Sequence, residues 1–140
     1  MTIRELSQLY HLNREVEMEQ QRLESLRAKA ESATTQLTGM PGAHNAGSKV
    51  EYYGSEIVDL EGIILAKRQQ CIHERNRLER YINDIDDSLT RQIFRLRFIN
   101  GLGWEQVAAC IGGNNTDKSV SKRCYTYIKT SLNKASNGIL

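Results

Sequence analysis

Proline and aromatic residues are scarce in this chain of 140 residues, which contains one proline and 6% aromatic residues. Long helices can therefore run without interruption, and a large aromatic core is excluded. No N-terminal apolar run resembles a signal peptide, and no stretch approaches the length needed to cross a bilayer. We therefore expect a helix-rich protein that stays in the cytoplasm.

Catalytic and metal-binding motifs are also missing. His73-Glu74 begins like a zinc-protease motif, but Arg77 stands where the second histidine is required. The cysteines form no Cys-x-x-Cys pair and fall on or beside apolar helical stripes, so we expect three small buried hydrophobic residues, Cys71, Cys110 and Cys124. The sequence predicts no enzyme activity, no metal site and no cofactor.

Charge is divided between the two ends of the chain. Residues 1–87 contain 11 Lys and Arg against 15 Asp and Glu, a net charge of −4, whereas residues 88–140 contain 8 against 2, a net charge of +6. A basic module attracts phosphates regardless of their sequence, and an acidic remainder keeps the rest of the surface off a polyanion. This division favours nucleic-acid binding by the C-terminal third.

Two N-terminal stretches have apolar residues at seven-residue intervals, separated by a loop of about residues 38–48 that holds three glycines and the only proline. Such repeats predict an antiparallel coiled-coil hairpin over residues 1–86. Polar residues interrupt the repeats at Glu19, Lys67 and Glu74. The first repeat consists of Leu9, Val16, Leu23, Ala30 and Leu37 with Leu12, Leu26 and Ala33, and the second of Val50, Ile57, Ile64, Cys71, Leu78 and Ile85 with Tyr53, Leu60 and Tyr81.

The second hairpin helix is apolar beyond its heptad positions, at Val58, Ile63, Leu65 and Ile72. A two-helix rod buries little by itself, so we expect this surface to pack against another chain, with a homodimer as the simplest closed form. The alternative is that these residues pack against the C-terminal part of the same chain.

Residues 87–132 carry the pattern of three short helices. The run Asn83-Asp84-Ile85-Asp86-Asp87-Ser88 ends the second hairpin helix and supplies caps for the next helix, because acidic side chains suit a helix N-terminus. In that helix Leu89, Ile93 and Leu96 face inward, with Phe94 and Phe98 around them. Gly101 and Gly103 end it. We expect this module to close its own small core and to be followed by a flexible tail, residues 133–140.

The last two helices of this module have the pattern of a helix-turn-helix. An apolar stripe of Trp104, Val107, Ala108 and Ile111 precedes the turn Gly112-Gly113-Asn114-Asn115. Thr116 can cap the next helix, whose inward stripe is Val120, Cys124, Tyr127 and Ile128. The opposite face of that helix carries Lys118, Lys122, Tyr125 and Lys129, with Ser119 and Thr126 beside it. This outward face is basic and contains one aromatic residue.

Residues 87–120 resemble the promoter-reading region four of bacterial sigma factors. The residues that carry this resemblance are Asp87, Leu89, Arg91, Ile93-Phe94, Leu96-Arg97-Phe98, Gly101-Leu102, Trp104, Val107-Ala108, Ile111-Gly112 and Val120. The whole chain is similar to small regulators encoded by phages of Gram-positive bacteria, which are related to late-gene activators of the RinA and ArpU type. This wider resemblance is carried by three segments: Ile3-Arg4-Glu5-Leu6, the run from Leu37 to Pro41 and the run from Asp86 to Phe94.

The resemblance implies a phage transcription regulator, an activator of late genes, that acts on double-stranded promoter DNA in a bacterial host cell and also contacts host RNA polymerase. It implies that Thr116 meets a phosphate at the helix N-terminus, and that Lys118, Ser119 and Lys122 lie nearest the groove. Arg123, Tyr125, Thr126 and Lys129 are then flanking contacts. The turn is about two residues longer than in sigma factors, so individual base contacts are not transferred.

Two other functions fit the same pattern. A small terminase subunit, which recognises DNA for phage genome packaging, also combines a helix-turn-helix with an oligomerising hairpin. A structural coiled-coil protein would instead use the C-terminal module to bind protein only.

Overall fold

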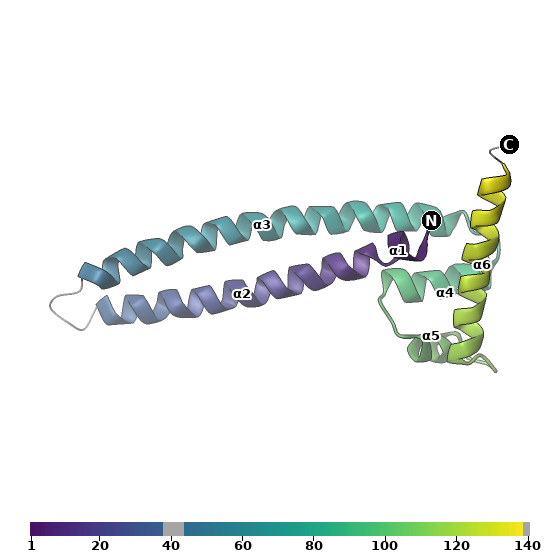
Figure 1. The fold of residues 1–140 in the computed structure, drawn as a ribbon. Helices are drawn as coiled ribbons and strands as arrows, with labels where there is room; N and C mark the ends of the chain where they lie inside the picture. The colour runs from purple at the N-terminus through teal and green to yellow at the C-terminus, as the bar shows by residue number, and fades with distance from the viewer. Residues whose placement is uncertain (38–43, 139–140) are drawn as a thin grey trace. The chain divides into compact units, whose positions relative to one another are not determined.

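The computed structural model describes residues 1–37 and 44–138, and every regular element in those ranges is helical (Figure 1). The predicted all-α class is confirmed. The helices, in chain order, are α1 (Ile3–Leu6), α2 (Gln8–Leu37), α3 (His44–Asn83), α4 (Ser88–Phe94), the π-helical turn η1 (Arg95–Ile99), α5 (Trp104–Ile111) and α6 (Asp117–Asn137). In the part of the chain described, no helix is long and apolar enough to span a membrane.

Two compact units make up the chain. Met1–His11 and Cys71–Leu140 form the terminal unit, and Leu12–Gln70 form the central unit. We expected a boundary after residue 86; the division instead falls inside α2 and α3, because residues of α1, early α2 and late α3 share a core with the C-terminal helices.

Two element ends also differ from the expectation. Helix α3 begins at His44, so residues 44–48 of the expected loop are helical, while residues 38–43 lie outside the described residues. Helix α6 continues to Asn137 and has Gly138 at its C-cap, so the helix covers most of the segment expected to be a flexible tail. No proline or glycine interrupts α6 before that glycine, which explains its length.

In the central unit, α2 and α3 lie side by side and run in opposite directions (Figure 1). Leu23 of α2 packs with Leu60 and Ile64 of α3, and Leu26 and Ile57 flank this cluster. Burial follows the predicted repeat: every heptad residue whose side chain is described is buried or half-buried. The side chain of Leu37 lies outside the described residues.

Ion pairs across the two helices agree with the antiparallel direction. Arg27 donates to Glu61 at 3.0 Å, and Lys67 donates to Glu15 at 2.8 Å, so residue numbers rise along one helix as they fall along the other. The hydrogen bond to Glu15 raises the pKa of Lys67. The lysine that interrupts the apolar repeat therefore places its ammonium group beside a carboxylate.

The terminal unit has a core built from both ends of the chain. Ile93, Phe94, Val107, Val120 and Cys124 of the C-terminal helices are almost completely buried. The same cluster contains residues from the first nine positions and from late α3, namely Leu6, Leu9, Leu78, Ile82 and Ile85. The expectation that residues 87–132 close their own core is therefore wrong, because so small a module buries too little apolar surface without these additions.

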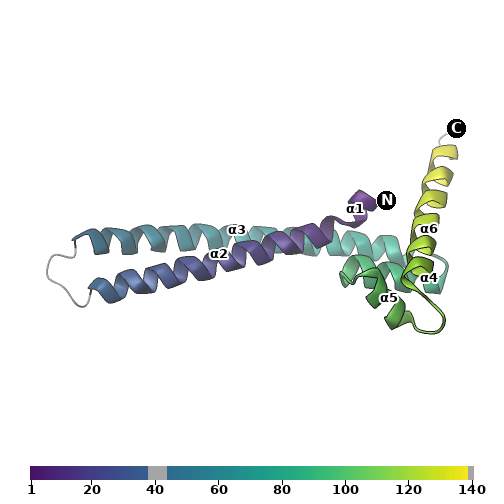
Figure 2. The ribbon, with the colours of Figure 1, turned by 60° about the horizontal axis from the view of Figure 1, so that its bottom comes forward.

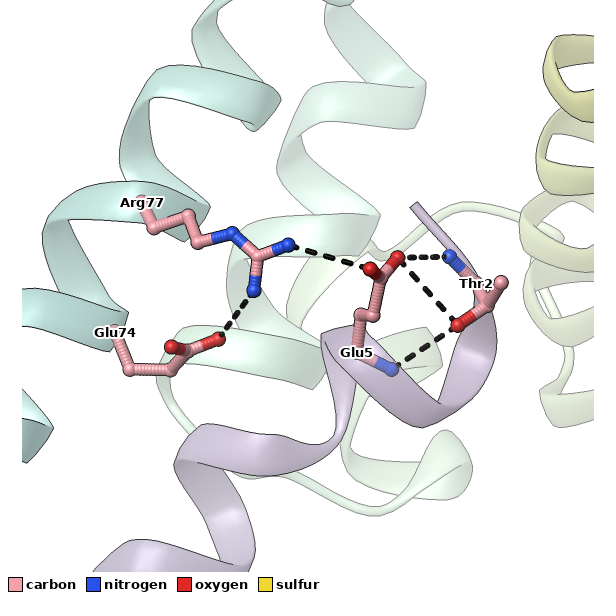
Figure 3. A network of polar contacts seen from close by, with 4 residues as sticks. All are labelled: Thr2, Glu5, Glu74 and Arg77. Atoms are coloured by element: carbon pink, nitrogen blue, oxygen red, sulfur yellow. Dashed lines mark hydrogen bonds and ion pairs between the residues drawn. The ribbon is translucent and has the colours of Figure 1, made fainter. Parts of the chain in front are cut away.

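A polar network fastens α1 to late α3 (Figure 3). The Glu5 carboxylate accepts a hydrogen bond from the Thr2 backbone N–H at 2.8 Å, and Arg77 of α3 donates to Glu5 at 3.3 Å and to Glu74 at 3.2 Å. The backbone hydrogen bond from Thr2 is the main cause of the lowered pKa of Glu5. The network holds α1 where Leu6 can enter the core.

Helix α4 begins within the predicted capping run, residues 83–88, and then differs from the predicted inner face. Asp87 accepts the Thr90 backbone N–H at 3.0 Å as N-cap. Phe94 and Phe98 are core residues, whereas Leu89 and Leu96 are only half-buried. The rings of Phe94 and Phe98 are 5.4 Å apart, and the wider turn of η1 brings Phe98 inward.

Candidate nucleic-acid interface

Helices α5 and α6 are joined by a glycine turn and pack against each other and against α4 (Figure 2). Gly112 and Gly113 have φ angles of 77° and 66°, a conformation that favours glycine. The Asn115 side-chain amide donates to the Gly112 carbonyl at 2.9 Å. Sequence and conformation therefore agree on where α5 ends and α6 begins.

Thr116 caps α6, as predicted. Its hydroxyl accepts the Ser119 backbone N–H at 3.2 Å, and the Ser119 hydroxyl accepts the Thr116 backbone N–H at 2.9 Å. Both hydroxyls therefore hydrogen-bond within the cap. Asp117 follows as the first helical residue, and its carboxylate places a negative charge where the helix dipole would otherwise attract a phosphate.

The inward face of α6 contains Val120, Cys124 and Ile128, which are buried as predicted, and Tyr127, which is half-buried. Burial raises the pKa of the Cys124 thiol to about 12. Cys71 is half-buried, and Cys110 is exposed, so the prediction that all three cysteines are buried is wrong for Cys110. Cys110 lies on α5 to one side of the stripe that faces the core.

The outward face of α6 is exposed along its whole length. Lys118, Lys122, Tyr125 and Lys129 are exposed, and about 100° per residue places them within a narrow stripe. The ring of Tyr125 makes an edge contact with Trp104 of α5, with centroids 5.9 Å apart. One aromatic residue of the stripe is thereby held against the preceding helix.

The arginines after residue 87 all have partners inside the terminal unit. Arg91 donates to the Ile85 carbonyl at 3.2 Å, and Arg95 donates to Glu79 at 2.6 Å. Arg97 donates to the Leu102 carbonyl at 2.9 Å and stands 4.6 Å over the Trp104 ring. The fourth arginine is Arg123, which pairs with Asp87.

The lysines of the same segment are different. Lys118, Lys122, Lys129 and Lys134 are exposed, and none of their ammonium groups has a hydrogen bond or ion pair to another of the residues described. Three of these four lysines lie on the outward stripe of α6. The cationic groups of the C-terminal segment that have no partner within the described chain are therefore all on one helix, α6.

Arg123 joins α6 to the start of α4. Its guanidinium donates to the Asp87 carboxylate at 2.9 Å and to the Thr90 hydroxyl at 3.3 Å. Hydrogen bonds from the Thr90 hydroxyl, from Arg123 and from the Thr90 backbone lower the pKa of Asp87 to about 2. Sequence reasoning placed Asp87 in a capping run but missed its pairing with Arg123, since the two residues stand 36 positions apart.

A shallow groove of about 550 Å³ runs beside this ion pair. Ser119, Lys122 and Thr126 of α6 line it, together with Asp87 and Thr90. Among the described residues, no group of three or more His, Cys, Asp or Glu side chains is placed to hold a metal ion. Glu74 of the zinc-protease-like pair accepts a hydrogen bond from Arg77.

Comparisons of the chain with protein-family models, with curated proteins and with solved structures gave no significant match.

Proposed function

We propose that α5, the glycine turn and α6 form a helix-turn-helix that binds double-stranded DNA. The observation that carries the proposal is the division of cations in the terminal unit. The four arginines after residue 87 bind groups of their own chain, and Lys118, Lys122 and Lys129 project together from α6. An exposed stripe of uncompensated lysines on a helix is suited to contact phosphates along a groove.

In this proposal α6 enters the major groove, and Lys118, Lys122 and Lys129 each contact a backbone phosphate. Lys118 and Lys122 lie nearest the groove, and Lys129, Tyr125 and Thr126 make flanking contacts. Arg123 is a positioning residue, because Asp87 neutralises its charge while the pair sets α6 against α4. Thr116 and Ser119 serve to start the helix, and Asp117 disfavours a phosphate at that point.

The role of the whole chain follows from the resemblance of its residues to phage late-gene regulators. We propose a phage transcription regulator in which the helix pair of the central unit, Leu12–Gln70, pairs two chains, and the terminal unit reads promoter DNA. Pairing of two modules makes the site bipartite. Contact with host RNA polymerase is a second activity of the same module.

DNA binding is tested by fluorescence anisotropy with a labelled duplex over a range of salt concentrations. The triple variant Lys118→Ala, Lys122→Ala, Lys129→Ala should weaken binding by at least about tenfold. It should also lower the slope of log K against log salt by about 2.7, which is three phosphate contacts at about 0.9 each.

A control variant removes the same charge from the central unit, at Arg14, Lys29 and Lys49, which are exposed. These changes to alanine should leave both affinity and slope close to those of the unchanged protein. Equal losses in the two triple variants would show that net charge, and not the α6 stripe, attracts the DNA.

The regulatory role is tested by recovering the fragments of a phage genome that the protein retains. Fragments upstream of promoters support regulation, whereas fragments from packaging sites support the terminase alternative. A second test asks whether the protein binds RNA polymerase in the absence of DNA. If the triple lysine variant binds polymerase as well as the unchanged protein does, polymerase contact is independent of the α6 stripe.

A further inference from the structure

Helix α3 carries a second heptad seam on its outer face. Its inner seam, with Ile57, Leu60 and Ile64, packs against α2. The outer seam consists of residues spaced alternately by three and four positions, all of them exposed: Ser55, Val58, Gly62, Leu65 and Gln69. Val58 is 66% exposed and Leu65 is 61% exposed. This spacing is the one that two packed helices use.

Gly62 makes an open site at the middle of the outer seam. A Cβ atom added at this position would meet no heavy atom within 4 Å, so nothing in the described part of the chain requires a glycine there. Glycine in a helix interior is unfavourable relative to alanine. Its one structural benefit is close approach of another segment, and a large side chain from a facing helix would fit over it.

Opposite charges stand on one flank of the outer seam. Glu61 directly precedes Gly62, and Arg68 directly precedes Gln69, so the two are equivalent heptad positions one repeat apart. When two identical helices pair antiparallel about a two-fold axis, equal flanks face each other. In the register that sets Gly62 against Leu65, each Glu61 faces an Arg68, which gives two complementary pairs.

The other arrangements are electrostatically worse. A shift by one heptad brings two Glu61 side chains or two Arg68 side chains together. Parallel pairing sets Glu61 opposite Ala66, and Arg68 opposite His73, five residues further along the facing helix. Charge therefore selects both the direction and the register.

We propose that a second copy of this chain packs antiparallel against α3 along the outer seam, with Gly62 facing Leu65 and Glu61 paired with Arg68 across the two-fold axis. This inference rests on the self-association that forms part of the proposed function and names its surface. It is tested without DNA, so failure of DNA binding would leave it standing. Ser55 and Gln69 are polar, so the seam is suited to a reversible dimer.

Sedimentation equilibrium of the full chain, over a concentration series reaching the high micromolar range, tests the seam. The unchanged protein should be a dimer, and Leu65→Glu should be a monomer because it places two carboxylates on the seam. Met18→Glu is the matched control, since Met18 is 63% exposed on α2 and should leave the dimer intact. Far-UV circular dichroism should show equal helix content in all three.

Two results would overturn the proposal. A monomeric unchanged protein would show that no second copy occupies the seam, and a dimer that survives Leu65→Glu would show that the chains associate elsewhere. If the unchanged protein is a monomer and a different protein binds at the seam, the proposal is overturned in the same way.

Direction and register are tested with two charge reversals. Glu61→Arg and Arg68→Glu should each raise the dimer dissociation constant by about tenfold, because every flank pair becomes repulsive. Mixing the two variants should restore dimers, since every flank pair of the mixed dimer again sets a guanidinium of one chain against a carboxylate of the other. The Glu61→Arg chain lacks the pair between Arg27 and Glu61 both alone and in the mixture, so that pair cannot account for restoration. Failure to restore would refute the antiparallel register.

Discussion

Replacement of Leu6 by alanine should destabilise the helices that carry the proposed DNA surface, although Leu6 is more than 100 residues away from that surface in the sequence. Leu6 is 0% exposed and lies in the same cluster as Phe94, Val107 and Val120. Buried leucine-to-alanine changes cost about 2–5 kcal/mol, with the higher values where the cavity cannot collapse. In a unit of this size, about 3 kcal/mol corresponds to a fall in Tm of roughly 15–20 °C.

Thermal melting followed by far-UV circular dichroism measures this change. Ile3→Ala is the control, because Ile3 belongs to the same short helix and is 37% exposed. Its loss should cost under about 1 kcal/mol and a few degrees. Melting of Leu6→Ala within a few degrees of Ile3→Ala would show that α1 does not belong to the core of the terminal unit.

Two further predictions concern pH and thiol reactivity. The pKa of Asp87 is lowered from 3.8 to about 2, so its contribution to stability is complete above the higher value and is lost as pH falls toward the lower one. Asp87→Asn keeps a capping side chain but removes the titrating carboxyl group and the ion pair with Arg123. As pH falls between those two values, the urea midpoint of this variant should therefore fall less than that of the unchanged protein. Parallel decreases of the two urea midpoints would exclude Asp87 as the titrating group. Iodoacetamide should modify exposed Cys110 in the folded protein and buried Cys124 only after unfolding, as mapped by mass spectrometry. Equal rates at the two thiols would contradict the burial of Cys124.

The sequence predicted the parts of the fold that depend on local pattern. Seven-residue spacing identified the buried and half-buried positions of α2 and α3. A capping run at residues 83–88 and the capping residue Thr116 located the starts of α4 and α6. These signals lie within one or two helical turns. They depend on backbone geometry that neighbouring residues share, and are therefore visible in a single sequence.

Contacts between distant segments were not predictable in the same way. Leu6 stands on an amphipathic stretch that fits the hairpin equally well, and nothing in its neighbourhood distinguishes a hairpin position from one in the terminal core. Arg123 lies in a basic helix and was grouped with its lysines, whereas the structure pairs it with a carboxylate. Charge composition located the basic module, but only the structure separates the paired arginines from the exposed lysines of α6.

The terminal unit is made of two pieces of chain separated by the 59 residues of Leu12–Gln70, and this gives the central helix pair a role in folding. Holding the ends of a free loop of that length together would cost about 4 kcal/mol in chain entropy. Pairing of α2 with α3 brings those ends together and offsets this cost. During synthesis, Leu6 and Leu9 can be buried only after α3 and α6 have been made, because their core contains residues of those helices. Damage to the helix pair should therefore lower the stability of α5 and α6 without touching them.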